Sequence, residues 1–203
     1  MFRVLLLSLT IFMTLSFVVN KLKQPTENPS ARVWIVQGNK RILVANQDIT
    51  LSKKPFRFEV EITGAEGIYL HAAQTDTAWQ RARLGQMPYQ QPFSPNVMAE
   101  ESFNAKRTLL IDDLSLSYWF FDPELAWHRF DKGAKIEAGI IKARKSVRRL
   151  WLNSHNPDHE STVKIADFSG DLYLVFMVGT PVSNDFFAET TVHQVTYTHI
   201  VFR

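Results

Sequence analysis

Residues Phe56 to Thr63 alternate strictly between apolar and polar side chains, and this pattern is the strongest constraint on the fold. Four apolar residues, the first Phe56 and the last Ile62, occupy every second position, with charged or polar residues between them. Because successive side chains of a β-strand point to opposite faces, this segment can bury one face and leave the other in water. We therefore expect Phe58 in the core and Glu59 on a solvent-facing surface, where replacement by alanine changes stability little.

Much of the remaining sequence has the same extended character. Gly38 and Asn39 separate two apolar runs and predict a hairpin, and residues 172–178 are apolar on both faces, as in a central strand. Ser169-Gly170-Asp171 predicts a second tight hairpin, between residues 163–168 and 172–178. The other predicted strands lie in residues 33–36, 42–45, 147–152 and 192–202, and residues 109–121 form a strand pair or one bent strand.

Two segments carry helical signals. Asp122 followed by Pro123 is typical of a helix start and predicts a short helix from Pro123 to about Asp131. Apolar residues between Ala134 and Ser146 recur at helical spacing, although Gly139 leaves a strand open there. The chain is therefore expected to contain one or two short helices.

Together these elements predict a mainly β domain over residues 32–203, built as a two-layer antiparallel β-sandwich or a jelly-roll. Strands do not alternate with helices, and the chain has neither a G-x-G-x-x-G fingerprint nor a phosphate-binding loop. A doubly wound nucleotide-binding fold is therefore disfavoured.

The N-terminus has the pattern of a targeting segment. Arg3 precedes the uncharged stretch Val4 to Val19, which predicts a hydrophobic helix. Residues 1–23 are interpreted as a signal peptide or an uncleaved membrane anchor, because no A-x-A cleavage site follows the stretch. The proline-containing residues 24–31 form a linker. We expect export to the periplasm or the extracellular space, with attachment to the membrane through residues 4–19 if these are retained.

Composition narrows the choice of partner. The chain has no cysteine, which excludes disulfides, thiolate metal sites and cysteine nucleophiles. The formal net charge of +3 comes from Arg3, Lys21 and Lys23, because residues 24–203 contain 20 basic and 20 acidic residues. A nucleic-acid-binding domain keeps its excess positive charge in the folded part, so nucleic acid is not expected as a partner.

The segment His155–Glu160 is the strongest candidate for chemistry. His155, Asp158 and His159 bring two imidazoles and a carboxylate close together in sequence, and this donor set can hold zinc, manganese or iron. Asn156 and Pro157 between them predict a turn, in which the two rings need not face one ion. The alternative is a hydrophilic hairpin loop, and we expect neither a metal nor another cofactor.

A local concentration of positive charge is a candidate for binding. Lys142, Arg144, Lys145, Arg148 and Arg149 place five cations in eight residues, which can meet an acidic lipid surface, a glycan or an anionic protein. The simpler interpretation is a solvated surface whose charge is balanced elsewhere in the domain. Arg144 and Arg148 are the residues that we select as candidates for partner contact.

Aromatic residues in an irregular connection are the other candidates. Trp79, Tyr89 and Phe93 lie in Gln74–Arg107, a long segment with little periodicity, and segments of this kind are usually functional loops or lids. Exposed rings there can stack on sugars or anchor a protein partner, whereas buried rings would only hold the loop on the sheet.

No sequence motif indicates nucleophilic catalysis, since the chain has no G-x-S-x-G elbow. The sequence therefore predicts an exported or membrane-tethered β-sandwich that binds a protein or glycan partner without catalysis. The alternative is a hydrolase with its site in residues 74–107 or in His155–Glu160.

Overall fold

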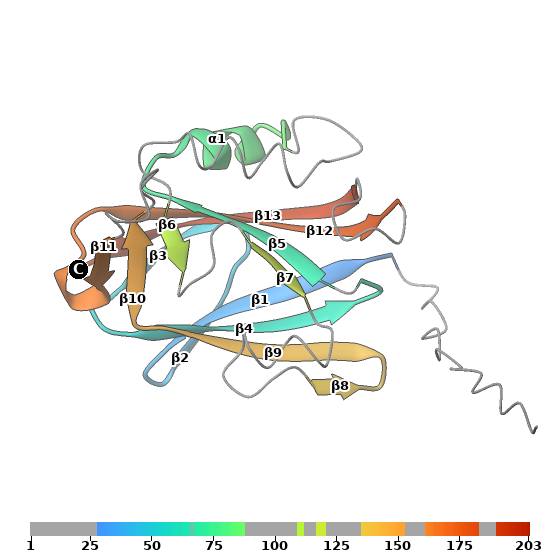
Figure 1. The fold of residues 1–203 in the computed structure, drawn as a ribbon, viewed down its shortest axis with the longest axis horizontal. Helices are drawn as coiled ribbons and strands as arrows, with labels where there is room; N and C mark the ends of the chain where they lie inside the picture. Colours follow the sequence, from blue (N-terminus) through green and yellow to red (C-terminus); the bar gives the residue numbers. More distant parts are fainter. Residues whose placement is uncertain are drawn as a thin grey trace, which may run out of the picture.

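The computed structural model describes residues 28–65, 67–87, 109–111, 117–120, 135–152, 161–182 and 190–203. The predicted hydrophobic stretch 4–19 and the predicted helix 123–131 lie outside these residues. In the part of the chain that is described, no helix is long and apolar enough to cross a membrane. The described elements are almost all strands, as expected, and two larger sheets face each other (Figure 1).

One large sheet, which we call sheet A, is antiparallel throughout. Its strand order is β2-β1-β4-β9-β8, so that β4 lies at the centre. The strands are β1 (Ser30–Gln37), β2 (Lys40–Leu43), β4 (Phe56–Thr63), β8 (Lys135–Glu137) and β9 (Ile140–Val147).

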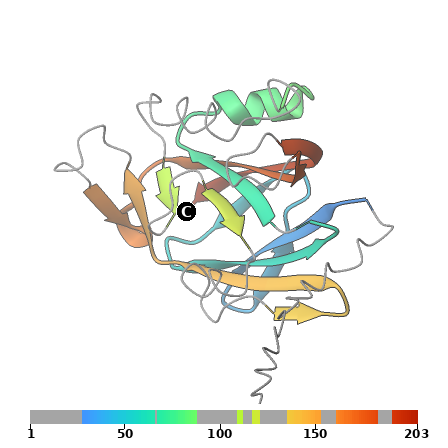
Figure 2. The ribbon, with the colours of Figure 1, turned by 45° about the vertical axis from the view of Figure 1, so that its right-hand side comes forward.

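The opposite large sheet, sheet B, has the order β3-β13-β12-β5-β7. It is mixed, because β3 pairs with β13 in parallel while its other pairs are antiparallel. A small sheet C, of order β11-β10-β6, stands beside the two large sheets (Figure 2). The strands of sheet B are β3 (Gln47–Leu51), β5 (Gly67–Ala73), β7 (Ser117–Phe120), β12 (Asp171–Pro181) and β13 (Thr190–Phe202). The strands of sheet C are β6 (Leu109–Ile111), β10 (Arg149–Leu152) and β11 (Ser161–Lys164).

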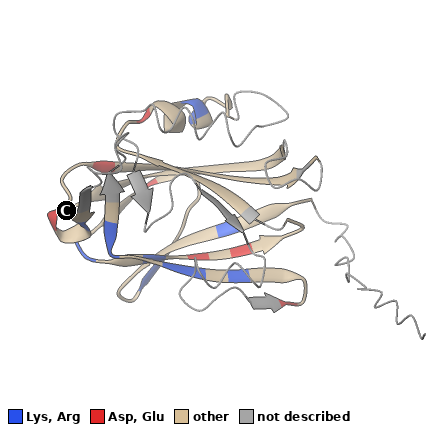
Figure 3. Ribbon diagram, viewed as in Figure 1, with Lys and Arg blue, Asp and Glu red and all other residues tan. Residues whose placement is uncertain are grey.

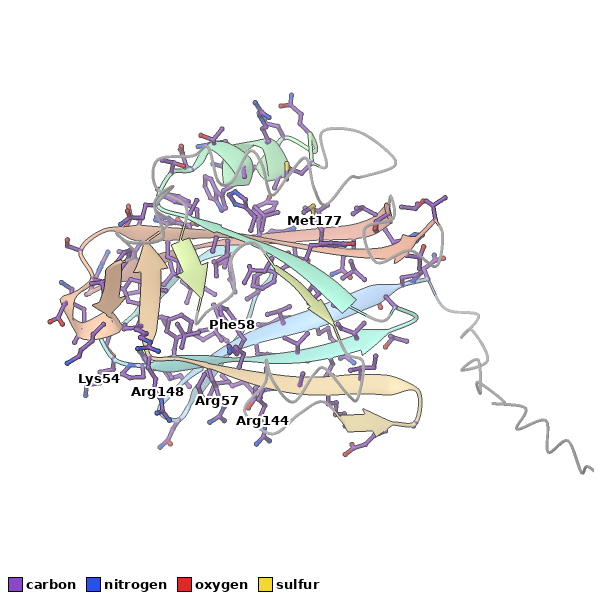
Figure 4. The ribbon with its side chains drawn as sticks, viewed as in Figure 1. Lys54, Arg57, Phe58, Arg144, Arg148 and Met177 are labelled. Atoms are coloured by element: carbon purple, nitrogen blue, oxygen red, sulfur yellow. The ribbon has the colours of Figure 1, made fainter. Side chains whose placement is uncertain are left out.

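The main core lies between sheets A and B, and the alternation of β4 leads directly to it. Every second residue of β4, from Phe56 to Ile62, is buried in this core. The Phe58 ring meets the Phe176 ring of β12 edge-on, with 5.8 Å between centroids. Figure 4 shows Phe58 in the space between the two sheets. The predicted strand 56–63 is confirmed, with one face in the core.

Strand β12 is buried on both faces, as its apolar sequence predicts. Leu174 and Phe176 belong to the main core, whereas Val175 and Met177 face a second cluster on the outer side of sheet B. The short helix α1 (Thr77–Arg83) covers that outer side and buries Ala78 and Ala82 against it. Figure 1 shows α1 lying across sheet B, on the opposite side of the molecule from sheet A. Part of the connection predicted to be irregular, residues 74–107, is therefore a helix that completes the packing of β12.

The first strand begins slightly before the predicted domain boundary. Ser30 starts β1, and Ala31 is fastened to sheet B by the side-chain amide of Gln194 on β13. Gln194 Oε1 accepts from Ala31 N at 2.7 Å, and Gln194 Nε2 donates to Ala31 O at 2.9 Å. The predicted hairpin at Gly38 and Asn39 joins β1 to β2, with Gly38 at a φ of +57°.

The helical alternative for residues 134–146 is wrong. The segment forms the antiparallel pair β8 and β9, joined by Ala138 and Gly139 at φ values of +52° and +79°. Two consecutive residues at positive φ are typical of the tightest hairpin turns, whose twist matches the strands that they connect. The apolar spacing of this segment therefore fits a strand whose core side holds Ile141, Ala143 and Val147.

The predicted hairpin at Ser169-Gly170-Asp171 is also wrong. Strand β11 ends at Lys164 and pairs with β10 in sheet C, whereas β12 pairs with β13 and β5 in sheet B. A 3-10 turn at Ile165–Asp167 lies between them, and it buries Ile165 and then Phe168 in the main core. The chain therefore changes sheets here instead of reversing within one sheet.

Candidate functional site: a cationic face on sheet A

The side of sheet A that faces away from sheet B carries cations from four strands. Antiparallel register sets Glu59 of β4 between Trp34 of β1 and Arg144 of β9, and sets Glu61 between Arg32 and Lys142. Directly paired residues share one face of a sheet, so these side chains all point outward with those of Arg41 and Arg57. We call this surface the cationic face; it comprises Arg32, Arg41, Arg57, Lys142 and Arg144, with Glu59, Glu61 and Glu137 among them. Figure 3 shows the Lys and Arg positions along β1, β4 and β9.

Glu59 is the point at which three arginines meet. Arg41 Nε donates to Glu59 Oε2 at 2.8 Å, and Arg57 donates to Glu59 Oε1 from Nε at 3.0 Å and lies within 2.9 Å of it through Nη2. Arg144 Nε is 3.9 Å from Oε1, an ion-pair distance too long for a hydrogen bond. The Glu59 side chain is only 16% exposed, whereas that of Arg144 is 60% exposed. Three guanidinium groups are therefore gathered above one carboxylate.

The pKa of Glu59 reflects these contacts. Burial alone would raise the pKa of this carboxyl group. The hydrogen bonds from Arg41 and Arg57, together with the positive charges of both, outweigh burial and hold the Glu59 pKa below its ordinary value. Glu59 is therefore a fixed negative charge at neutral pH, and the three arginines around it exceed that charge by two.

An indole ring supports the same cluster. The Arg41 guanidinium lies 3.8 Å from the centroid of the Trp34 ring, and the Arg32 guanidinium lies 5.8 Å from it. Cations over an indole face are attracted to its π-electrons, and a planar guanidinium can also stack there. Trp34 therefore restricts the orientation of Arg41, whose Nε is at the same time committed to Glu59.

Two further cations extend the cationic face at one end. Arg148 follows β9 on its outward-facing side, and Lys54 precedes β4; both are exposed. Figure 4 shows Lys54, Arg57, Arg144 and Arg148 along the same side of the molecule, away from Phe58. The Gln37 side chain fixes the loop that bears Lys54, because its Nε2 donates to the carbonyl oxygens of Ser52 and Lys54 at 2.9 and 2.8 Å.

The sequence-predicted cation cluster is divided by strand geometry. Lys142, Arg144 and Arg148 lie on the outward-facing positions of β9 and just beyond it, whereas Lys145 points to the core side and is 7% exposed. Arg149 begins β10 in sheet C. Two of the selected candidates, Arg144 and Arg148, thus lie at the cationic face. The other arginines of this face, from β1, β2 and β4, were missed because strand register, not sequence proximity, brings them there.

The third candidate that the structure describes, Trp79, belongs to a different surface. Trp79 lies on α1, half-buried against sheet B, with its ring centroid 5.5 Å from that of Tyr173 and 6.1 Å from that of Tyr197. Arg83 covers the Trp79 ring at 4.6 Å. Trp79 therefore fastens α1 to the sheet, and its ring is not available as a free platform. Tyr89 and Phe93 lie outside the described residues.

Histidines on the outer side of sheet B are packed into the same layer. The His199 ring stacks on Tyr173 at 4.4 Å, between Asp48 and Asp171, each with a carboxylate oxygen 3.5 Å from a ring nitrogen. His71 of β5 pairs with Val175 of β12, and burial lowers the pKa of His71 to about 4. His71 is therefore neutral at physiological pH.

The candidate metal ligands His155, Asp158 and His159 lie outside the described residues. Strands β10 and β11, which flank that segment, are antiparallel neighbours with Leu152 opposite Ser161. Among the described residues, no group of three or more His, Asp or Glu side chains is placed to hold a metal ion.

The cationic face carries charged side chains that are exposed to solvent, which suits reversible binding of anions. It offers guanidinium and ammonium donors, and the carboxylates among the described residues of this face are engaged with its arginines and with Lys142. Comparison with known proteins gives no matching family model, no curated relative and no similar solved structure.

Proposed function

We propose that this chain is an exported, membrane-tethered β-sandwich domain that binds an acidic glycan through its cationic face and performs no catalysis. The observation that carries the proposal is the convergence of Arg32, Arg41, Arg57, Lys142 and Arg144 on one side of sheet A. Export and tethering are supported by the charged start and the uncharged stretch 4–19 of the sequence.

The spacing of the cations favours an extended polyanion. Neighbouring strands lie about 4.8 Å apart, and residues on one face of a strand repeat about every 6.6 Å. Cations at these intervals can meet successive charges of a polymer laid across the strands. The side chains also reach solvent, with exposed fractions of 67% for Arg32, 60% for Arg144 and 44% for Lys142.

A protein partner fits this surface less well than a glycan. The centres of protein–protein interfaces are depleted in charged residues and enriched in aromatic anchors. The cationic face has the opposite composition. Its one described aromatic residue, Trp34, is flanked by Arg41 and Arg32.

Binding of the full-length protein, in detergent, to immobilised dextran sulfate and to uncharged dextran tests the proposal. We expect retention on dextran sulfate alone, and an affinity that falls as salt rises, because bound counterions are released on association. Replacing Arg57 and Arg144 by glutamate should weaken binding at least tenfold.

The matched control is the double variant Arg81→Glu/Arg83→Glu, an equal change of charge at α1 on the opposite side of the molecule. We expect it to leave binding within about twofold. Equal retention on both matrices, or equal losses in the two charge-reversal variants, would refute glycan binding by this face.

Export has a separate test, which uses a reporter enzyme that is active only outside the cytoplasm. A fusion to the full chain should be active, and the same fusion without residues 1–23 should be inactive. Activity of both fusions would contradict the proposed targeting role.

A further inference from the structure

We propose that Arg41, Arg57 and Arg144 form a preorganised site for a phosphate monoester, and that Glu59 is the positioning residue that holds them together. The inference rests on the proposed function, since it names the acidic group of the glycan that the cationic face would select. Its basis is the geometry around Glu59, where hydrogen bonds and an indole contact fix the guanidinium groups of Arg41 and Arg57, and an ion pair links Arg144 of a third strand to the same carboxylate.

Donors remain after the contacts with Glu59 are counted. A guanidinium has five N–H donors in a planar fork. Glu59 engages Arg41 through Nε, with Oε2 as the acceptor, and engages the Nε and Nη2 side of Arg57. The terminal nitrogens of Arg41 and the second terminal nitrogen of Arg57 are not used in those contacts. Arg144 lies at ion-pair distance only, so its whole fork can serve a ligand.

The charge of the cluster distinguishes between anions. Three arginines around one carboxylate leave two positive charges. A phosphate monoester carries a charge near −2 above its second pKa of about 6 and has three terminal oxygens that accept hydrogen bonds. A sulfate ester or a carboxylate carries one negative charge and would leave one positive charge without a counter-charge. The cluster therefore matches a phosphate monoester in charge and in number of acceptors.

Glu59 acts on the ligand through the arginines. Without its charge, the three guanidinium groups would repel one another, and nothing among the described residues would hold Arg57 in place through Nε. Generic attraction and preorganisation then make opposite predictions for Glu59→Gln. The variant adds one net positive charge to the face, so generic attraction predicts tighter binding to every anion and a preference for the doubly charged phosphate that is kept or increased. Preorganisation predicts a loss of selectivity for phosphate.

Competition on the full-length protein in detergent measures that selectivity. Protein bound to immobilised dextran sulfate is released with glucose 6-phosphate, glucose 6-sulfate or glucuronate, each at pH 7.5. We expect glucose 6-phosphate to act at a concentration at least fivefold lower than the other two sugars. At pH 5 the preference should fall below twofold, because the phosphate loses most of its second charge, and no histidine lies among the described residues of the cationic face.

Two variants complete the experiment. Glu59→Gln should reduce the preference for glucose 6-phosphate to less than twofold while binding to dextran sulfate is kept. Arg144→Lys preserves the charge but removes the fork, and it should have the same effect even if Glu59→Gln proves unstable. Arg83→Gln at α1 should retain the full preference.

The outcomes separate the two proposals. Failure of the wild-type protein to bind dextran sulfate would overturn the proposed function. Binding without a preference among the three sugars, or an unchanged preference in both Glu59→Gln and Arg144→Lys, would overturn the phosphate site and leave the proposed function standing.

Discussion

The outer surfaces of the two large sheets differ in the character of their side chains. On sheet B the outward side chains of β12 are apolar, and α1 covers them with Ala78, Trp79 and Ala82. On sheet A the outward side chains of β4 and β9 are charged, and they are organised by ion pairs around Glu59. The apolar outward side chains of a strand are thus buried beneath a covering helix, whereas the charged outward side chains are ordered by ion pairs.

The largest effect should come from the core that both sheets share. Phe58→Ala should lower the free energy of unfolding by about 3–5 kcal/mol, because Phe58 is fully buried and packs on Phe176 of the opposite sheet. Urea unfolding followed by circular dichroism measures the loss. A loss below about 1 kcal/mol would mean that the inner face of β4 is not the core face.

The next effect separates the two outer surfaces. Met177→Ala, on the covered side of β12, should cost about 2–4 kcal/mol, since Met177 is fully buried in the cluster beneath α1. The matched outward position on β4 is Glu61, whose replacement by alanine should change stability by less than about 0.5 kcal/mol. Equal losses in the two variants would show that the outward side of β4 is also covered.

Acid should also distinguish the two surfaces, beginning with sheet B. The pKa of His71 is lowered to about 4 by burial, from 6.5, so the unfolded chain takes up a proton at higher pH than the folded chain. The contribution of neutral His71 to the free energy of unfolding is therefore fully present above pH 6.5. It declines as the pH falls to about 4, by up to about 3 kcal/mol. Unfolding at a series of pH values should show a shallower decline in His71→Gln than in the wild-type protein; parallel curves would count against a buried neutral His71.

A smaller effect than those of the buried residues belongs to the centre of the cationic face. Glu59→Ala should cost about 1 kcal/mol, more than an ordinary surface substitution, because Glu59 accepts hydrogen bonds from Arg41 and Arg57. Since the pKa of Glu59 is lowered, its contribution is present above the ordinary carboxyl pKa and is lost as the pH falls through the lower folded value. The wild-type protein and Glu59→Ala should therefore converge in stability as the pH falls below the ordinary carboxyl pKa. A constant difference between pH 7 and pH 3 would exclude a charge-dependent role.

Much of the fold could be predicted in those strands where burial of one or both faces determines the pattern of apolar and polar side chains. The alternation of β4 and the doubly apolar β12 were both interpreted correctly, because burial imposes a period of two on the first and none on the second. The segment 134–146 was ambiguous, since apolar residues three and four apart suit a helix as well as a hairpin. The turn at Ala138 and Gly139, both at positive φ, determines that the segment is a hairpin and not a helix. Alanine rarely adopts positive φ, so the sequence does not indicate this turn.

The sheet change after β11 and the composition of the cationic face depend on information that is not local. Gly170 suggests a hairpin reversal within one sheet. Instead, Ile165 and Phe168 are buried in the main core, and the chain passes from sheet C to sheet B. Arg144 and Arg148 could be selected from local charge density. Arg41 and Arg57 could not, because only the pairing of β2 with β1 and of β1 with β4 brings them beside Arg144.

The fastening of Ala31 by Gln194 has a mechanical consequence. Any pull on the chain from its N-terminal side enters the domain at Ser30 and runs along β1, which lies between β2 and β4. When the pull is directed along the axis of β1, the hydrogen bonds of β1 to both neighbours are loaded in shear, all together, and not peeled open one at a time. The Gln194 amide passes part of the load from Ala31 to β13, so both halves of the sandwich resist it at the point of entry.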